Sequence, residues 1–147
     1  MLEVKVFDET KKPTQEDKER IVDFLYKHLE KYGDPKDDIM RCLNYSVKDR
    51  ESFGGFVIEG IMDGETVGAV LVNETGMSGY IPENILVYIA THKDYRGKGV
   101  GKKLMKKTIE MANGDIALHV EHDNPARFLY EKYKFTNKYL EMRYKKV

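Results

Sequence analysis

Cysteine is almost missing from this chain, since Cys42 is the only one among its 147 residues. One thiol cannot form an intramolecular disulfide, so we expect a protein of the reducing cytoplasm. Cys42 stands beside Leu43 in an apolar stripe of helical spacing, which favours a core residue over a nucleophile. No group of cysteines and histidines has the spacing of zinc ligands, and we expect no metal.

An excess of one charge and a long apolar run are also missing. The chain carries 25 basic and 25 acidic residues, whereas a general nucleic-acid binder would be strongly basic. The longest apolar run, residues 85–90, is far shorter than the ~20 residues that cross a bilayer. Apolar and charged residues alternate within residues 1–6, whereas a signal peptide has a continuous apolar stretch. We therefore expect one domain over residues 1–147, with neither nucleic acid nor membrane as a partner.

The most informative stretch combines glycine with basic charge. Gly97, Gly99 and Gly101 follow the apolar run 85–91 and open a helical pattern. Glycines let the backbone approach a ligand closely, and the first N–H groups of a helix have no partners inside it. Between residues 93 and 107, seven lysines and arginines stand against a single acidic residue, Asp94. This pattern predicts a site for a phosphate or pyrophosphate group.

The spacing of these residues narrows the type of phosphate site. The dinucleotide pattern G-x-G-x-x-G fails because Lys102 stands where the last glycine is needed. The P-loop fails because only three residues separate Gly97 from Gly101. The pattern Arg/Gln-x-x-Gly-x-Gly/Ala fits Arg96, Gly99 and Gly101, and it resembles the coenzyme A pyrophosphate loop of the GNAT superfamily of acetyl-CoA-dependent N-acyltransferases. A plain glycine-rich turn with solvated lysines is the alternative explanation of this stretch alone.

A second stretch, residues 124–135, resembles the other signature of that superfamily, Asn-x-x-Ala-x-x-Leu-Tyr-Glu-Lys-x-Gly-Phe. Asn124 and Tyr130 are one residue closer than in the commoner form, and Lys134 replaces the glycine. The shorter spacing leaves open what the Asn124 side chain contacts. Lys134 takes the place of a glycine that would end the helix, but this position has no role in the chemistry. The two motifs stand in the superfamily's order, which favours membership over a chance match.

Local signals predict an order of elements that covers nearly the whole chain. Thr14 and Asp17 form a capping-box pattern, Asp34 with Pro35 is typical of a second helix start, and Asp63-Gly64 predicts a hairpin. We expect strands at 2–7, 56–62, 66–72, 84–91, 116–120 and 139–144, and helices after Thr14, Asp34, the glycine stretch and Asn124. This order resembles the GNAT fold, an α+β (α/β/α layered) fold with a mixed, mostly antiparallel central sheet flanked by helices.

Several side chains should face the core. His28 lies on the apolar stripe of the first helix and is expected to be buried and hydrogen-bonded, and His92 to be a turn residue. Further inward-facing positions are expected at Ile21, Val22, Leu25, Leu29, Tyr32, Met40, Leu43, Val47, Val100, Leu104, Thr108, Ile109, Met111, Ala112, Phe128 and Leu129.

The resemblance implies where acetyl-CoA binds. It assigns the pyrophosphate to the backbone of the loop, at Arg96, Gly97, Lys98, Gly99, Val100, Gly101 and Lys102. It assigns the pantetheine arm to the strand end at Ile89, Ala90 and Thr91, which would pair with it like an extra strand and supply an N–H to the thioester carbonyl. Asn124 would contact the same arm, unless it is only a helix cap.

The resemblance also implies the acid and the acceptor side. Tyr130 would protonate the departing thiolate, since a phenol is protonated at neutral pH; a core tyrosine is the alternative. For the base, His119 ranks first, because an imidazole titrates near neutrality, Glu83 second, and a water chain without a single base close behind. The first two helices would border the acceptor pocket, with Tyr88 lining it.

The function implied is transfer of an acetyl group from acetyl-CoA to a primary amine, by direct attack in a ternary complex. The acceptor is a small molecule or a protein amine, and the slightly acidic stretch 8–38 leans towards a cationic small amine or polyamine. A catalytically silent acyl-CoA sensor and an enzyme for another acyl group remain alternatives. A homodimer is possible.

Overall fold

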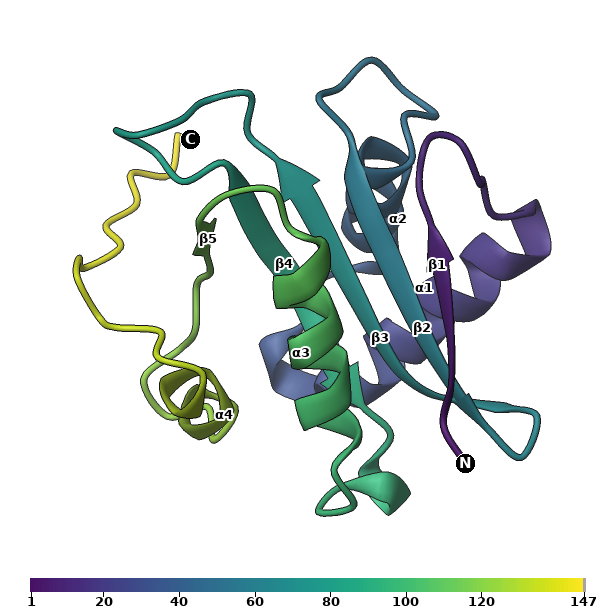
Figure 1. Ribbon diagram of the computed structural model, residues 1–147. Helices are drawn as coiled ribbons and strands as arrows, with labels where there is room; N and C mark the ends of the chain where they lie inside the picture. The colour runs from purple at the N-terminus through teal and green to yellow at the C-terminus, as the bar shows by residue number, and fades with distance from the viewer. Residues whose placement is uncertain (147) are drawn as a thin grey trace.

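A single sheet with the strand order β1-β2-β3-β4-β5 runs through the molecule (Figure 1). The computed structural model describes residues 1–146. The first four strands pair antiparallel and β5 pairs parallel to β4, so the prediction of a mixed, mostly antiparallel sheet is confirmed. The elements in chain order are β1 (Glu3–Phe7), α1 (Gln15–Leu29), η1 (Glu30–Tyr32), α2 (Lys36–Ser46), β2 (Gly55–Met62), β3 (Glu65–Glu74), β4 (Asn84–Thr91), η2 (Lys93–Tyr95), α3 (Val100–Met111), β5 (Ile116–Ala117) and α4 (Arg127–Lys132).

Helices cover both faces of the sheet, which gives the three layers expected from the sequence (Figure 1). Helices α1 and α2 bury one apolar cluster against the sheet, with Ile21, Leu25 and Leu43 fully enclosed. Helices α3 and α4 bury a second cluster on the opposite face, around Leu104 and Tyr130. Burial of these two sets of side chains supplies the main stabilisation of the fold.

Helix α1 begins as predicted. The Thr14 hydroxyl accepts a hydrogen bond from the N–H of Asp17 at 3.1 Å, and the Asp17 carboxylate accepts one from the N–H of Thr14 at 2.9 Å. The prediction for α2 is wrong by one residue, because Pro35 and not Asp34 precedes the first helical residue. Asp34 does not cap the helix, since its carboxylate accepts a hydrogen bond from Tyr88 on β4 instead.

The predicted hairpin is confirmed between β2 and β3. Asp63 has φ 53° and Gly64 has φ 74°, as a two-residue turn of the primed type requires. On β2, the carboxylate of Glu59 is fully buried, and Arg20 of α1 donates two hydrogen bonds of 2.8 Å to it. Thr66 of β3 donates a third at 2.6 Å. This paired charge therefore joins α1 to the hairpin.

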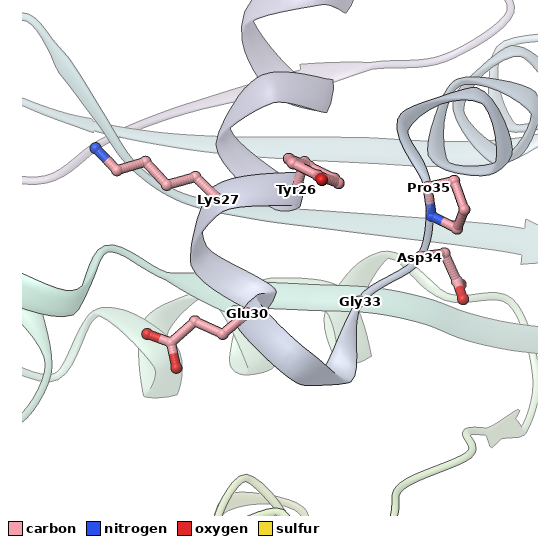
Figure 2. A pocket seen from close by; sticks show the side chains of 6 residues that line it. All are labelled: Tyr26, Lys27, Glu30, Gly33, Asp34 and Pro35. Carbon is pink, nitrogen blue, oxygen red and sulfur yellow. The ribbon is translucent and has the colours of Figure 1, made fainter.

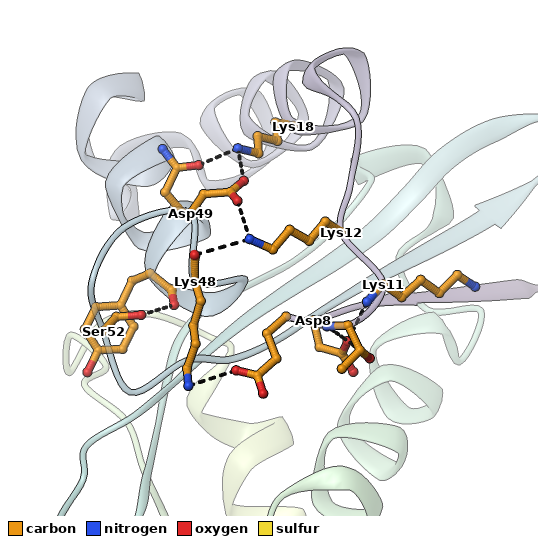
Figure 3. A network of polar contacts seen from close by, with 11 residues as sticks. Asp8, Lys11, Lys12, Lys18, Lys48, Asp49 and Ser52 are labelled. Carbon is orange, nitrogen blue, oxygen red and sulfur yellow. Dashed lines mark hydrogen bonds and ion pairs between the residues drawn. The ribbon is translucent and has the colours of Figure 1, made fainter.

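A polar network holds together the loops at one end of α1 and α2 (Figure 3). Lys12 and Lys18 both pair with Asp49, and Lys48 pairs with Glu9 at 2.8 Å. These groups are partly exposed, so each pair adds little stability by itself.

The C-terminal predictions are partly wrong. Residues 139–144 form no strand, and Leu140, Met142 and Tyr144 are exposed. Strand β5 ends at Ala117 rather than at Val120. Strand β5 pairs with β4 over two residues only. A strand this short offers too few backbone groups for a further strand to pair with its outer edge.

Two predicted inward-facing residues are also exposed. Ile109 of α3 is 40% exposed, and Met105 is fully buried in its place. The buried stripe is centred on Leu104, and Ile109 lies about 140° around the helix axis from it. Phe128 of α4 is 69% exposed, because Tyr130 supplies the buried face of that short helix.

Candidate functional site

Strand β4 contains a bulge at its centre. Tyr88 pairs with Leu71 and Leu86 pairs with Val72, which leaves Val87 as the extra residue. Val87 and Tyr88 consequently both pack towards the cluster under α1 and α2, whereas Leu86 packs towards α3. Such bulges re-aim a side chain, and here the bulge points the Tyr88 ring at the α1–α2 connection.

Strands β4 and β5 separate directly beside this bulge. Their pairing covers Asn84 with Ile116 and Ile85 with Ala117, and within residues 1–146 it goes no further. The edge of β4 that faces away from β3 therefore presents backbone groups from residue 86 to residue 91 without a neighbouring strand. An extended molecule can pair with such an edge. The predicted pantetheine contacts Ile89, Ala90 and Thr91 lie on this stretch.

The glycine loop forms a concave backbone surface between β4 and α3. Gly97 and Gly99 have φ 79° and 83°, in the left-handed region that glycine adopts without strain. A Cβ atom at either position would meet no atom within 4 Å, so the loop is open on that side. The first helical bond of α3 runs from the N–H of Lys103 to the carbonyl of Gly99, and among the described residues the N–H groups of 97–102 have no acceptor. This arrangement suits a phosphate group.

Two lysines meet beside the loop. Lys102 lies close enough to Lys132 of α4 to lower the pKa of Lys132. Tyr133 donates a hydrogen bond of 3.1 Å to the carbonyl of Lys102, which holds α4 against the start of α3. Two neighbouring ammonium groups repel each other, and an anion between them would relieve that repulsion. Sequence reasoning predicted Lys102 but missed Lys132, because only the fold brings α4 to the loop.

The side chain of Arg96 contacts the ends of α1 and β4. Its guanidinium donates to the carbonyl of His28 at 3.1 Å and to the carbonyl of Thr91 at 3.3 Å, and it lies 3.9 Å from the Glu30 carboxylate. Arg96 therefore fastens the loop to the end of α1.

A stack of rings reinforces that attachment. The rings of Phe24, His28, His92 and Tyr95 follow one another at centroid distances of 4.6, 4.3 and 5.3 Å. His28 is buried as predicted and accepts a hydrogen bond from the N–H of Lys93 at 3.4 Å. Burial, together with His92 and nearby cations, lowers the pKa of His28 to about 4, so the ring is neutral at pH 7.

Tyr130 lies on α4 with its ring enclosed in the α3-side cluster. It is 7% exposed, and burial raises the pKa of its hydroxyl to about 12. Among residues 1–146 no group accepts a hydrogen bond from this hydroxyl. Tyr130 is therefore a protonated donor without a protein acceptor, although the same burial also fits a core tyrosine.

The two candidate bases occupy different surroundings. Glu83 precedes β4, at the opposite end of that strand from the glycine loop, and its carboxylate accepts a hydrogen bond from the N–H of Asp115 at 3.0 Å. His119 follows β5 and is exposed, on the segment that diverges from β4. The structure thus ties Glu83 to a turn and leaves His119 beside the separated strands.

Two further predicted residues have structural roles. The side-chain oxygen of Asn124 accepts a hydrogen bond from the N–H of Ala126 at 2.9 Å, which orders the turn before α4 without capping the helix. Cys42 is buried, and burial raises the pKa of its thiol to about 12, so it is a core residue as predicted. Within residues 1–146, no cluster of three metal-ligating side chains is present, and no helix is long and apolar enough to cross a membrane.

An open hollow of about 500 Å³ lies at the end of α1, beside the connection to α2 (Figure 2). Asp34 at its edge accepts a hydrogen bond of 2.5 Å from the hydroxyl of Tyr88. The adjoining η1 is tied to the segment after β5, because Tyr32 donates to the carbonyl of Asp123 at 3.1 Å. Sequence reasoning placed Tyr88 on this side but assigned Asp34 to a helix cap. The hollow is lined by Tyr26, Lys27, Glu30, Gly33, Asp34 and Pro35.

The chain is similar in sequence to known acetyltransferases. A family model described as an acetyltransferase (GNAT) domain matches residues 53–137. An acetyltransferase from Yersinia pestis (strain Pestoides F) is 32% identical over 139 residues, which cover 89% of this chain and 85% of the relative.

Two solved structures share the fold over nearly their whole length. An aminoglycoside acetyltransferase from an uncultured soil metagenomic sample, in complex with sisomicin, has a TM-score of 0.64 at 14% identity and covers 99% of this chain and 97% of its own. A ribosomal-protein-alanine N-acetyltransferase from Brucella melitensis biovar Abortus 2308 has a TM-score of 0.64 at 18% identity and covers 99% of both chains. At these identities the similarity is one of fold.

Proposed function

This chain belongs to the GNAT family of acetyltransferases, and we propose that it moves an acetyl group from acetyl-CoA to a primary amine by direct attack in a ternary complex. The observation that carries the proposal is the open glycine loop, whose N–H groups at residues 97–102 have no acceptor within the described chain. We treat residues 1–147 as one domain, since both apolar clusters pack on the same sheet.

The residues present fit a coenzyme A pyrophosphate. Backbone N–H groups from Gly97 to Lys102 supply donors, and Lys102 with Lys132 supplies positive charge beside them. The free edge of β4 at residues 89–91 offers backbone groups to the pantetheine arm. Acetyl-CoA supplies the activated acyl group as a thioester. In this account no metal takes part.

Three groups of this chain would act on protons and charge. A backbone N–H of the β4 edge polarises the carbonyl of the thioester, because a fixed dipole costs no reorganisation during the reaction. Tyr130 donates its phenolic proton to the departing thiolate. His119 takes a proton from the acceptor ammonium, directly or through water. Glu83 is the second choice, because it already accepts a hydrogen bond from Asp115.

The test is release of coenzyme A thiol from acetyl-CoA in the presence of single primary amines. We expect amine-dependent release, with the acetylated amine as the product by mass spectrometry. The His119→Ala variant should lose the acid limb of the pH–rate profile, while His122→Ala, an exposed histidine three residues on, should keep it. An unchanged profile in His119→Ala would remove His119 from the mechanism and favour the water chain.

A further inference from the structure

Asp34 carries a negative charge that no cation of the described chain neutralises. One oxygen of its carboxylate accepts the 2.5 Å hydrogen bond from Tyr88, and no lysine, arginine or histidine within residues 1–146 forms an ion pair with Asp34. Neighbouring carboxylates are different: Asp23 pairs with Lys36 at 2.9 Å, and Glu30 lies 3.9 Å from Arg96. Asp34 is an exposed residue, and within residues 1–146 its second carboxylate oxygen accepts no hydrogen bond.

The position of Asp34 is determined by a buried partner. Tyr88 is 8% exposed, packs in the cluster under α1 and α2, and follows the bulge at Val87. Because the ring is held by packing, its hydroxyl fixes one carboxylate oxygen and thereby the direction of the other. An exposed aspartate on a connection would otherwise sample several rotamers, so this pair is a preorganised anion.

The surrounding hollow suits an organic cation. Figure 2 shows Asp34 at one side of the hollow, with the Tyr26 ring facing the same space and Lys27 extending away from Asp34. An aromatic ring attracts cations, and in this structure the ammonium of Lys36 lies 5.2 Å from the Tyr26 centroid. The hollow has a volume of about 500 Å³ and is open to solvent, so it leaves room for a small amine beside Asp34.

The distance from β4 indicates which part of an acceptor would reach Asp34. The carboxylate lies one tyrosine side chain and one hydrogen bond away from the β4 backbone, where the proposed reaction takes place. A carboxylate beside the reacting amine would raise the pKa of that amine and oppose its deprotonation. At the end of the Tyr88 ring, the same charge acts on a more distant group of the acceptor.

We propose that Asp34, oriented by Tyr88, binds the second, non-reacting ammonium group of a small aliphatic diamine whose other amine is acetylated at β4. This assignment rests on the proposed acetyl transfer and names the acceptor class for it. Asp34 and Tyr88 thereby select the acceptor, and neither takes a proton from the reacting amine.

The experiment compares 1,4-diaminobutane with butylamine, which lacks the second amine. In the wild-type protein kcat/KM should be roughly 10- to 100-fold higher for the diamine, the effect expected of one charge-assisted hydrogen bond. Asp34→Asn should remove that preference and leave butylamine turnover and the Kd of acetyl-CoA within about twofold. Asp37→Asn, an exposed carboxylate in the first turn of α2, is the matched control and should keep the preference.

A binding measurement tests the hollow without turnover. Isothermal titration of the acetyl-CoA-free protein with 1,4-diaminobutane should show binding that Asp34→Asn weakens and butylamine does not reproduce. Tyr88→Phe, which keeps the ring but not the donor, should weaken diamine binding as well and serves if Asp34→Asn fails to fold. Equal use of the two amines by the wild type, or unchanged diamine binding in both variants, would overturn the proposal. Absent acetyl-CoA binding would instead overturn the proposed function.

Discussion

Arg96 donates a hydrogen bond of 3.1 Å to the main-chain carbonyl of His28, and this contact joins the glycine loop to the end of α1. The side chain of this loop arginine thus contacts the protein itself. The ring stack from Phe24 to Tyr95 runs along the same junction.

Loss of the Arg96 side chain should weaken cofactor binding. Arg96→Ala removes two hydrogen bonds that hold the loop but leaves its N–H groups in place, so we expect the Kd of acetyl-CoA to rise roughly 10- to 100-fold. Isothermal titration measures this. Lys93→Ala removes the same charge from a side chain that forms no ion pair within residues 1–146, and equal weakening in both variants would show that only charge matters.

The buried His28 makes stability depend on pH. The unfolded chain takes up this proton below about pH 6.5, whereas the folded protein does so only near pH 4. Between these values the unfolded state binds more protons, so the free energy of unfolding falls by about 2–3 kcal/mol as the pH is lowered. Urea unfolding at pH 7, 5.5 and 4.5 measures the loss.

The matched variant for this prediction is His28→Asn, which keeps a hydrogen-bond acceptor near the ring Nδ1 position but cannot be protonated. Its free energy of unfolding should change less between pH 7 and pH 4.5 than that of the wild type. The same dependence in both proteins would assign the acid sensitivity to other groups.

Lys134 occupies a conformation that suits glycine better. Its φ is 69°, and it closes α4 in a Schellman motif with bonds from Lys134 to Glu131 and from Phe135 to Tyr130. Lys134→Gly should therefore raise the free energy of unfolding by about 1 kcal/mol, measured by urea or thermal unfolding. Lys138→Gly, in the irregular C-terminal segment, should bring no gain. A destabilised Lys134→Gly protein would mean that the lysine side chain contributes more than its backbone costs.

Tyr130 should affect turnover and not cofactor binding. Tyr130→Phe keeps the buried ring but removes the proton donor, so kcat should fall roughly 100- to 10,000-fold with the Kd of acetyl-CoA little changed. Steady-state thiol release and titration measure the two quantities. Tyr139→Phe, an exposed tyrosine, is the control, and undiminished turnover in Tyr130→Phe would leave Tyr130 as a core residue only.

Features that depend on neighbours close in sequence were predictable. The capping box of Thr14 with Asp17, the turn at Asp63-Gly64 and the glycine loop each follow from a few adjacent residues, and the structure has all three. The family and the layered fold followed from two such local motifs and their order.

Features that depend on contacts across the fold were not predictable. Asp34 reads as a helix cap until β4 brings Tyr88 to it, and Lys132 has no visible partner until α4 packs beside Lys102. The bulge at Val87 could not be predicted, because the residues around it are all apolar and show no break in pattern. The alternation of apolar and charged residues at 139–144 predicted a strand. Such a pattern cannot show whether a neighbouring strand is available to pair with it.

The most direct test of the account is thermal unfolding of the purified protein with acetyl-CoA, coenzyme A, NAD and ATP in separate samples. At a hundred times its Kd a ligand stabilises the folded state by about 2.7 kcal/mol, which raises Tm by several degrees in a domain of this size. We expect this rise with acetyl-CoA and coenzyme A and not with NAD or ATP. No rise with either coenzyme A species would contradict the account, and the glycine loop would then be only a turn.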